Sequence, residues 1–105
     1  MTIKQKKSDA VKFLEKLTGG PLTLGETLWS IRRCEEWSQT EFAKKLGVTT
    51  SHICDIEKGR KVVSPERAAR FAKRLGYSEA QFVRLALQDM LKQSGLSYSV
   101  RLEAA

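Results

Sequence analysis

The sequence has little cysteine, proline and histidine, and it has no long apolar run. Its two cysteines, Cys34 and Cys54, are far apart and form no Cys-x-x-Cys pair. We therefore expect two reduced thiols in a cytoplasmic protein rather than a disulfide framework. The single histidine, His52, makes a poor tetrahedral ligand set with two distant cysteines, so we expect no metal site and no cofactor.

Features of membrane and secreted proteins are missing as well. Charged residues interrupt every apolar stretch well before the ~20 residues that a membrane-spanning helix needs. The basic N-terminus is not followed by an apolar segment, which argues against a secretory signal. No predicted helix combines a wide apolar face with a lysine-rich one, so we expect no membrane partner.

Residue patterns typical of enzymes are also absent. The sequence has no paired catalytic carboxylates and no Ser-His-Asp or Cys-His arrangement with supporting spacing. It has no glycine-rich loop that could cradle a phosphate. We therefore expect that the protein is not an enzyme.

Positive charge, by contrast, is abundant. The 105 residues include 19 Lys and Arg against 12 Asp and Glu, a net charge of +7 that favours polyanionic partners. Residues 1–20 carry five positive and two negative charges, and residues 65–105 carry seven and four. Residues 21–64 are nearly balanced, so any cationic face there must come from the fold.

Five segments repeat their apolar residues every three or four positions, as amphipathic helices do. Each begins at a Ser or Thr that can cap a helix, as in the capping boxes Thr23-x-x-Glu26 and Ser38-x-x-Glu41. The predicted helices run over about 23–37, 38–46, 49–58, 64–75 and 78–93. The predicted fold class is therefore all-α.

Breaks in the pattern divide the chain into three parts. Residues 1–20 form an N-terminal arm with one short helix, which either contacts phosphate or is a solvated terminus. Residues 21–94 form the main domain. In residues 95–105 apolar and polar side chains alternate, which predicts a short C-terminal β-strand tail, with a disordered tail as the alternative.

Residues 38–60, "SQTEFAKKLGVTTSHICDIEKGR", contain two helices joined by a very short turn. Helices of about eight residues are unstable alone, because helix nucleation is costly, so the two must pack at a fixed angle on a shared core. A short turn with glycine allows the steep crossing of a helix-turn-helix. The first half of the second helix then projects, and it carries short hydrogen-bonding side chains suited to base edges and phosphates.

The stretches "SQTEFAKKLGV", "HICDIEKGR" and "SPERAARFAKRLG" closely resemble the phage Cro and repressor family, also called the XRE family of bacterial regulators. The resemblance runs from about Leu24 to Met90. It implies a five-helix helix-turn-helix domain that binds double-stranded DNA and regulates transcription. It also implies a homodimeric repressor on a pseudo-palindromic operator, with half-sites about 34 Å apart.

The resemblance assigns roles at matched positions. Gln39 would bind a DNA phosphate, and Lys58, Arg60 and Lys61 would hold further phosphates. The groove-facing positions of the second helix are Thr49, Thr50, Ser51 and Asp55. His52 is either a DNA contact or a surface histidine.

Two acidic residues near this helix need separate interpretations. Asp55 either reads a cytosine amino group or points towards a basic neighbour, since a carboxylate is repelled by phosphates. Glu57 is expected to be structural and to pair with Arg32 or Arg33.

Two segments are candidates for a dimer or partner contact, because the last helix has more apolar residues than one face needs and a lone strand needs a neighbour. The residues we expect there are Phe82, Leu85 and Met90 on the helix and Tyr98, Val100 and Leu102 on the tail. The tail would pair with a second copy or add to the sheet of a partner.

Small XRE proteins of this layout are often antitoxins, so the partner could be a small RNA-cleaving toxin. The alternatives are an interaction module that mainly neutralises such a toxin, and a phage-type repressor without one.

Overall fold

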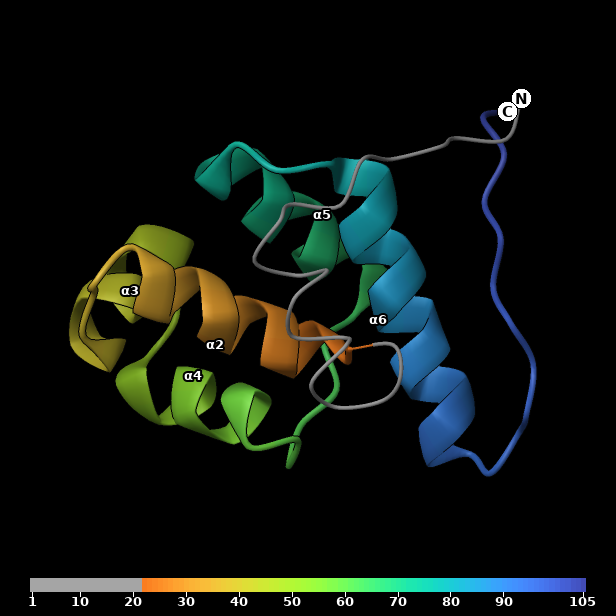
Figure 1. Ribbon diagram of the computed structural model, residues 1–105, viewed down its shortest axis with the longest axis horizontal. Helices are drawn as coiled ribbons and strands as arrows, with labels where there is room; N and C mark the ends of the chain where they lie inside the picture. The colour runs from red at the N-terminus through yellow and green to blue at the C-terminus, as the bar shows by residue number, and fades with distance from the viewer. Residues whose placement is uncertain (1–21) are drawn as a thin grey trace.

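Five α-helices, with no regular strand, make up residues 22–105, the part of the chain that the computed structural model describes (Figure 1). They are α2 (Leu24–Cys34), α3 (Gln39–Leu46), α4 (Thr50–Glu57), α5 (Pro65–Leu75) and α6 (Glu79–Gln93). The predicted all-α, five-helix domain is therefore confirmed. The predicted arm and its short helix lie outside the described residues.

The helix ends are set by local side-chain chemistry, as the sequence predicts. Thr23 and Ser38 are the N-caps of α2 and α3, and both form complete capping boxes. In the second box the backbone N–H of Glu41 donates to Ser38 Oγ over 3.1 Å, and the Ser38 N–H donates back to the Glu41 carboxylate. Gly47 ends α3 at a φ of 72°, a left-handed conformation that glycine adopts without a side-chain clash.

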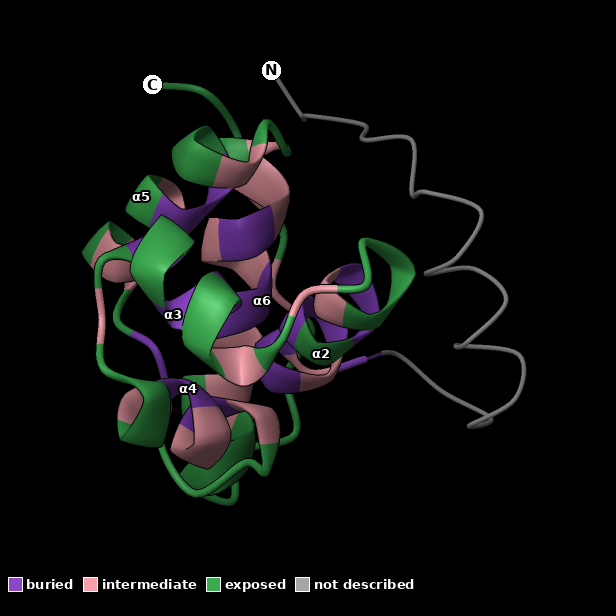
Figure 2. Ribbon diagram, turned by 90° about the vertical axis from the view of Figure 1, so that its left-hand side faces the viewer, coloured by how far each residue is buried: buried purple, intermediate pink, exposed green. Residues whose placement is uncertain are grey.

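The core lies where the inner faces of all five helices meet. Phe42, Phe71 and Phe82 are its largest side chains, and none is more than 1% exposed. Figure 2 shows that the buried residues of each helix turn towards this centre while exposed residues cover the outside. Neither α3 nor α4 has enough apolar surface to be stable alone, so this common core holds them at their relative angle.

Two close contacts fix α2 within the domain. Gly25 lies against the backbone of α4, where an added Cβ would collide with the carbonyl oxygen of Ile56. At the start of α2, Asp89 of α6 accepts a hydrogen bond from the Leu24 N–H over 2.9 Å. Burial raises the pKa of Asp89, and this backbone hydrogen bond lowers it in part. Together the contacts hold α2 between α4 and α6.

The C-terminal tail runs beside α6 in an extended conformation (Figure 1), but it does not form the regular strand predicted for residues 96–103. Within residues 22–105 only Glu103 has a strand-type bridge. The physical reason is that a strand needs a neighbouring strand, and residues 22–105 offer the tail none. Instead, the side-chain amide of Gln88 bonds the tail backbone: it donates to the Tyr98 carbonyl and accepts from the Val100 N–H.

Part of the predicted contact surface on α6 is wrong. Phe82 and Leu85 are only 1% and 4% exposed, because they lie on the face that packs into the core. Met90 and Tyr98 remain available, at 42% and 65% exposure. Val100 and Leu102 are half-buried on the tail.

Candidate nucleic-acid interface

The first turn of α4 projects from the molecule. On its inner side Ile53 and Ile56 are almost completely buried, and they anchor the helix in the core. On its outer side Thr50 and Ser51 are exposed. The two helices α3 and α4 are joined only by residues 47–49. This is the geometry of a helix-turn-helix, in which the second helix can enter a DNA groove.

Thr49 serves as the N-cap of α4 and remains exposed. Its Oγ1 accepts a hydrogen bond from the His52 N–H over 3.1 Å. The hydroxyl hydrogen is not used in this bond, so Thr49 can still donate to a phosphate or a base. Three consecutive hydroxyl groups, from Thr49 to Ser51, therefore lie at the exposed start of the helix.

Asp55 lies on the same outer side, but basic residues surround its carboxylate. Arg60 Nη1 is 3.6 Å from Asp55 Oδ1, and Lys61 Nζ is 3.9 Å from Asp55 Oδ2. Of the two interpretations of Asp55, the structure therefore has the one in which it points to a basic neighbour. The pairing also reduces the repulsion that this carboxylate would exert on a nearby phosphate.

The predicted phosphate-binding cations follow directly after α4. Lys58, Arg60 and Lys61 are all exposed, and the N–H of Arg60 donates to the Asp55 carbonyl over 2.8 Å. That hydrogen bond turns the chain sharply at the helix end. As a result the three cations are displayed together beside the outer face of α4.

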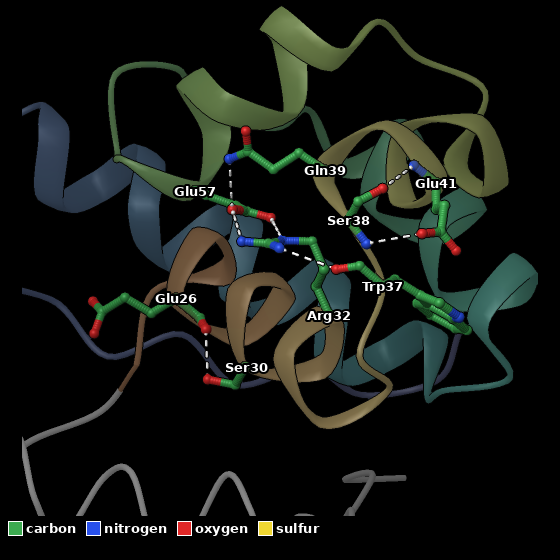
Figure 3. Close-up of polar contacts among 8 residues, drawn as sticks. All are labelled: Glu26, Ser30, Arg32, Trp37, Ser38, Gln39, Glu41 and Glu57. Atoms are coloured by element: carbon green, nitrogen blue, oxygen red, sulfur yellow. Dashed lines mark hydrogen bonds and ion pairs between the residues drawn. The ribbon is translucent and has the colours of Figure 1, made fainter.

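Glu57, the last residue of α4, pairs with Arg32 of α2 (Figure 3). Arg32 is one of the two partners predicted for Glu57. The contact is bidentate, with 2.7 Å between Arg32 Nε and Glu57 Oε2 and 3.1 Å between Nη2 and Oε1. The Glu57 side chain is only 2% exposed and that of Arg32 11%. Arg32 also donates to the Trp37 carbonyl over 3.1 Å, which fixes the α2–α3 connection. Arg33 instead lies over the Trp29 ring.

Gln39, predicted to bind phosphate, is held by the same pair. Its Nε2 donates to Glu57 Oε1 over 3.1 Å, as Figure 3 shows. One amide hydrogen is thereby used, and the second remains free to donate. The sequence indicated a polar residue at the start of α3, but not that the recognition helix itself would orient its amide.

His52 meets a residue that the sequence did not single out. Arg67, in the first turn of α5, places Nη1 3.1 Å from Nε2 and 3.3 Å from Nδ1 of the His52 ring. The pKa of His52 is lowered from its ordinary value of 6.5, first by burial and then by the positive charges of Arg67 and Lys61, while Asp55 acts in the opposite sense. No local signal links residues 52 and 67, because only the packing of α5 brings them together.

These features define a class: a helix-turn-helix DNA-binding protein, whose recognition helix is α4. The sequence profile of the helix-turn-helix family matches residues 31–82. Among solved structures, the clp gene regulator ClgR from Corynebacterium glutamicum is similar, with 32% identity and a TM-score of 0.51 over 69% of this chain and 77% of that one. No curated protein matches the sequence.

The chain therefore belongs to the XRE-type helix-turn-helix family, and it is a DNA-binding protein of the transcriptional-regulator class. Within residues 22–105 no helix is both long and apolar enough to cross a membrane. In proteins of this class the N-terminal residues of the recognition helix contact base edges in the major groove.

Removing one member of the buried ion pair should strongly destabilise the fold. Glu57→Ala leaves Arg32 charged and unpaired in a nearly buried position, so we expect the free energy of unfolding to fall by about 3–5 kcal/mol. Urea denaturation followed by circular dichroism measures it. Glu79→Ala is the matched control, because the Glu79–Lys73 pair is exposed, and it should change stability by less than about 1 kcal/mol. Equal effects of the two substitutions would contradict the assignment.

The single histidine allows a direct test of the His52–Arg67 contact. NMR titration of the imidazole should give a pKa below 6.5, and Arg67→Ala should raise it while Lys92→Ala does not. Because the folded protein resists protonating His52, the stability that neutral His52 contributes is complete above pH 6.5 and declines as the pH falls below it. If Arg67→Ala leaves the pKa of His52 at the wild-type value, Arg67 does not face the ring in solution.

Proposed function

We propose that this protein is a homodimeric repressor that occupies a pseudo-palindromic operator, including one near its own gene, and thereby excludes RNA polymerase. The observation that carries this proposal is the exposed first turn of α4, held in place by the buried Arg32–Glu57 pair. A rigid, exposed helix start can be inserted into the major groove without first being ordered. The proposal gives the chain no catalytic role and places it in the cytoplasm, where its DNA is.

The contacts divide by chemistry. Thr50 and Ser51 would read base edges, since they are exposed and their hydroxyl groups form no side-chain hydrogen bond within residues 22–105. Gln39 would donate its second amide hydrogen to a phosphate on one side of α4. The cations Lys58, Arg60 and Lys61 would bind phosphates beyond the C-terminal end of the helix, which releases counterions and makes affinity depend on salt.

Dimerisation is supported by apolar surface on one side of the molecule. Met90 near the end of α6 is 42% exposed, and Leu96 and Tyr98 on the adjoining tail are 46% and 65% exposed. Exposed large apolar side chains that form a contiguous patch are typical of protein interfaces. A second copy that covers them across a two-fold axis would present two α4 helices to successive turns of DNA.

The same tail favours a second function, neutralisation of a small RNA-cleaving toxin. Its backbone is extended, and the Gln88 side chain bonds it to α6 through two hydrogen bonds. An extended segment of this kind can be added to the edge of a partner's sheet. Repression and toxin binding are compatible, because α4 and the tail are different parts of the surface.

Operator recognition is tested by removing the two free hydroxyl groups. A footprint on the DNA upstream of the gene defines the operator. The double variant Thr50→Ala, Ser51→Ala should bind this operator with less preference over random duplex than the wild type does. The expected reduction is about 1–3 kcal/mol for each base interaction that the substitutions remove. Affinity for random duplex should stay the same, because phosphate contacts are retained. Ser97→Ala removes a hydroxyl from the tail and is the control. Unchanged discrimination in the double variant would rule out base reading by α4.

The dimer is tested by adding charge to its proposed surface. Analytical ultracentrifugation should find the wild type as a dimer and Met90→Lys with Tyr98→Ser as a monomer, since burying an unpaired ammonium is costly. Thr40→Lys, at an exposed position of α3, adds the same charge elsewhere and should remain dimeric. A wild type that is monomeric at all concentrations would refute the homodimer. The exposed apolar residues of α6 and the tail would then need a different partner.

A further inference from the structure

α5 carries a row of three arginines on one face. Its inner face is formed by Ala68, Phe71 and Ala72, all of which are buried. Residues three, four and seven positions apart share a face of an α-helix, so Arg67, Arg70 and Arg74 lie in one line along the outside. We call these three residues the α5 arginine row.

Both ends of the row contact the helix-turn-helix. Arg67 Nη1 lies against the His52 ring at the start of α4, 3.1 Å from Nε2. Arg74 Nη1 donates to the carbonyl of Lys45 over 3.4 Å and lies beside Gly47 in the turn between α3 and α4. Arg70 is exposed and lies between them on the helix. The row therefore follows the edge of the motif from the turn to the recognition helix.

Among residues 22–105, no carboxylate is within ion-pair distance of any arginine in the row. Four other cations of residues 22–105 do have such a partner: Arg32 pairs with Glu57, Arg60 and Lys61 with Asp55, and Lys73 with Glu79. Three uncompensated guanidinium groups on one helix face produce a local positive potential that attracts a polyanion.

The row lies on the side of α4 opposite to Gln39. Around α4, His52 contacts the row and Glu57 contacts Gln39. The buried residues Ile53 and Ile56 separate these two contacts on the inner side of the helix, and Ser51 separates them on the outer side. A groove that receives the outer side of α4 thus has Gln39 at one wall and the arginine row at the other.

We propose that the α5 arginine row is a second phosphate-binding track, which holds the DNA backbone on the wall of the groove opposite to Gln39. This inference rests on the proposed binding of double-stranded DNA. Guanidinium groups match phosphate oxygens with two parallel hydrogen bonds. The row spans about 10 Å of helix. Because a DNA strand carries a phosphate about every 3.4 Å along the duplex axis, the row can serve several successive phosphates.

The three arginines differ in what holds them. Arg67 and Arg74 are already oriented by protein contacts, so less side-chain freedom is given up when they bind. Arg70 is exposed and has no ion pair with a carboxylate among the described residues, so its side chain is free to reach phosphate. Substituting Arg70 therefore removes a phosphate contact without disturbing the fold.

The test measures the salt dependence of binding to a random-sequence 30-bp duplex by fluorescence anisotropy. Arg70→Gln should reduce the log–log slope of affinity against salt by about 0.9, the value expected when one phosphate interaction is removed. Between about 50 and 200 mM salt, the affinity of the variant should therefore fall by a factor about three times smaller than that of the wild type. Arg70→Lys should keep the wild-type slope, because it keeps the charge.

Arg101→Gln removes one positive charge from the exposed tail and is the matched control, for which the slope should stay at the wild-type value. If Arg70→Gln binds as the wild type does while the wild type retains salt-dependent binding, the arginine row is not a phosphate track, and the proposed function is unaffected. A wild type that does not bind duplex DNA at low salt would overturn both.

Discussion

The buried pair between Arg32 and Glu57 is the interaction on which the geometry of the DNA-binding surface depends. It joins α2 to the end of α4, and through the Trp37 carbonyl and the Gln39 amide it also fixes the 35–38 connection and the start of α3. Desolvating two charges costs much of what their attraction contributes, so such a pair adds little net stability. Its effect here is positional, because any other orientation of α4 would leave a buried charge without its partner.

Electrostatically, the recognition helix is not the source of the positive charge on this surface. Within α4 itself the only charged residues are Asp55 and Glu57, and both are paired with cations. The cations lie around it, in the loop that follows the helix and on α5. Such an arrangement leaves short hydroxyl side chains at the centre, where base edges would lie, and longer cationic side chains at the edges, where phosphates would lie.

At the other end of the molecule, α6 and the tail offer a surface of a different kind. One face of α6 packs into the core, while Met90 and the tail residues Leu96 and Tyr98 remain exposed. Gln88 substitutes for a neighbouring strand by bonding the backbone on either side of Ser99. The domain thus separates a polar, cationic surface, which we propose for DNA, from an apolar one, which we propose for a second protein chain.

Local signals were enough to predict the five helices, since caps such as Ser38 and Gly47 act within a few residues of sequence and the apolar period marks the buried face. They also placed Thr50 and Ser51 at an exposed helix start. They did not distinguish Phe82 and Leu85, which pack into the core, from Met90, which is exposed. The reason is that α6 has apolar residues on more than one face, so residue type alone does not show which of them are buried. Nor could they show that the alternating tail would be bonded by the Gln88 side chain.

What the sequence by itself determined is therefore the set of helices and the short turn between α3 and α4, because capping and periodicity depend on neighbours along the chain. The tertiary structure alone decided which distant residues meet. Only the packing of α2 and α5 against the motif chose Arg32 as the partner of Glu57 and brought Arg67 to His52 and Arg74 to Gly47. Contacts between residues 15 to 27 positions apart depend on how helices cross, and no local pattern encodes that.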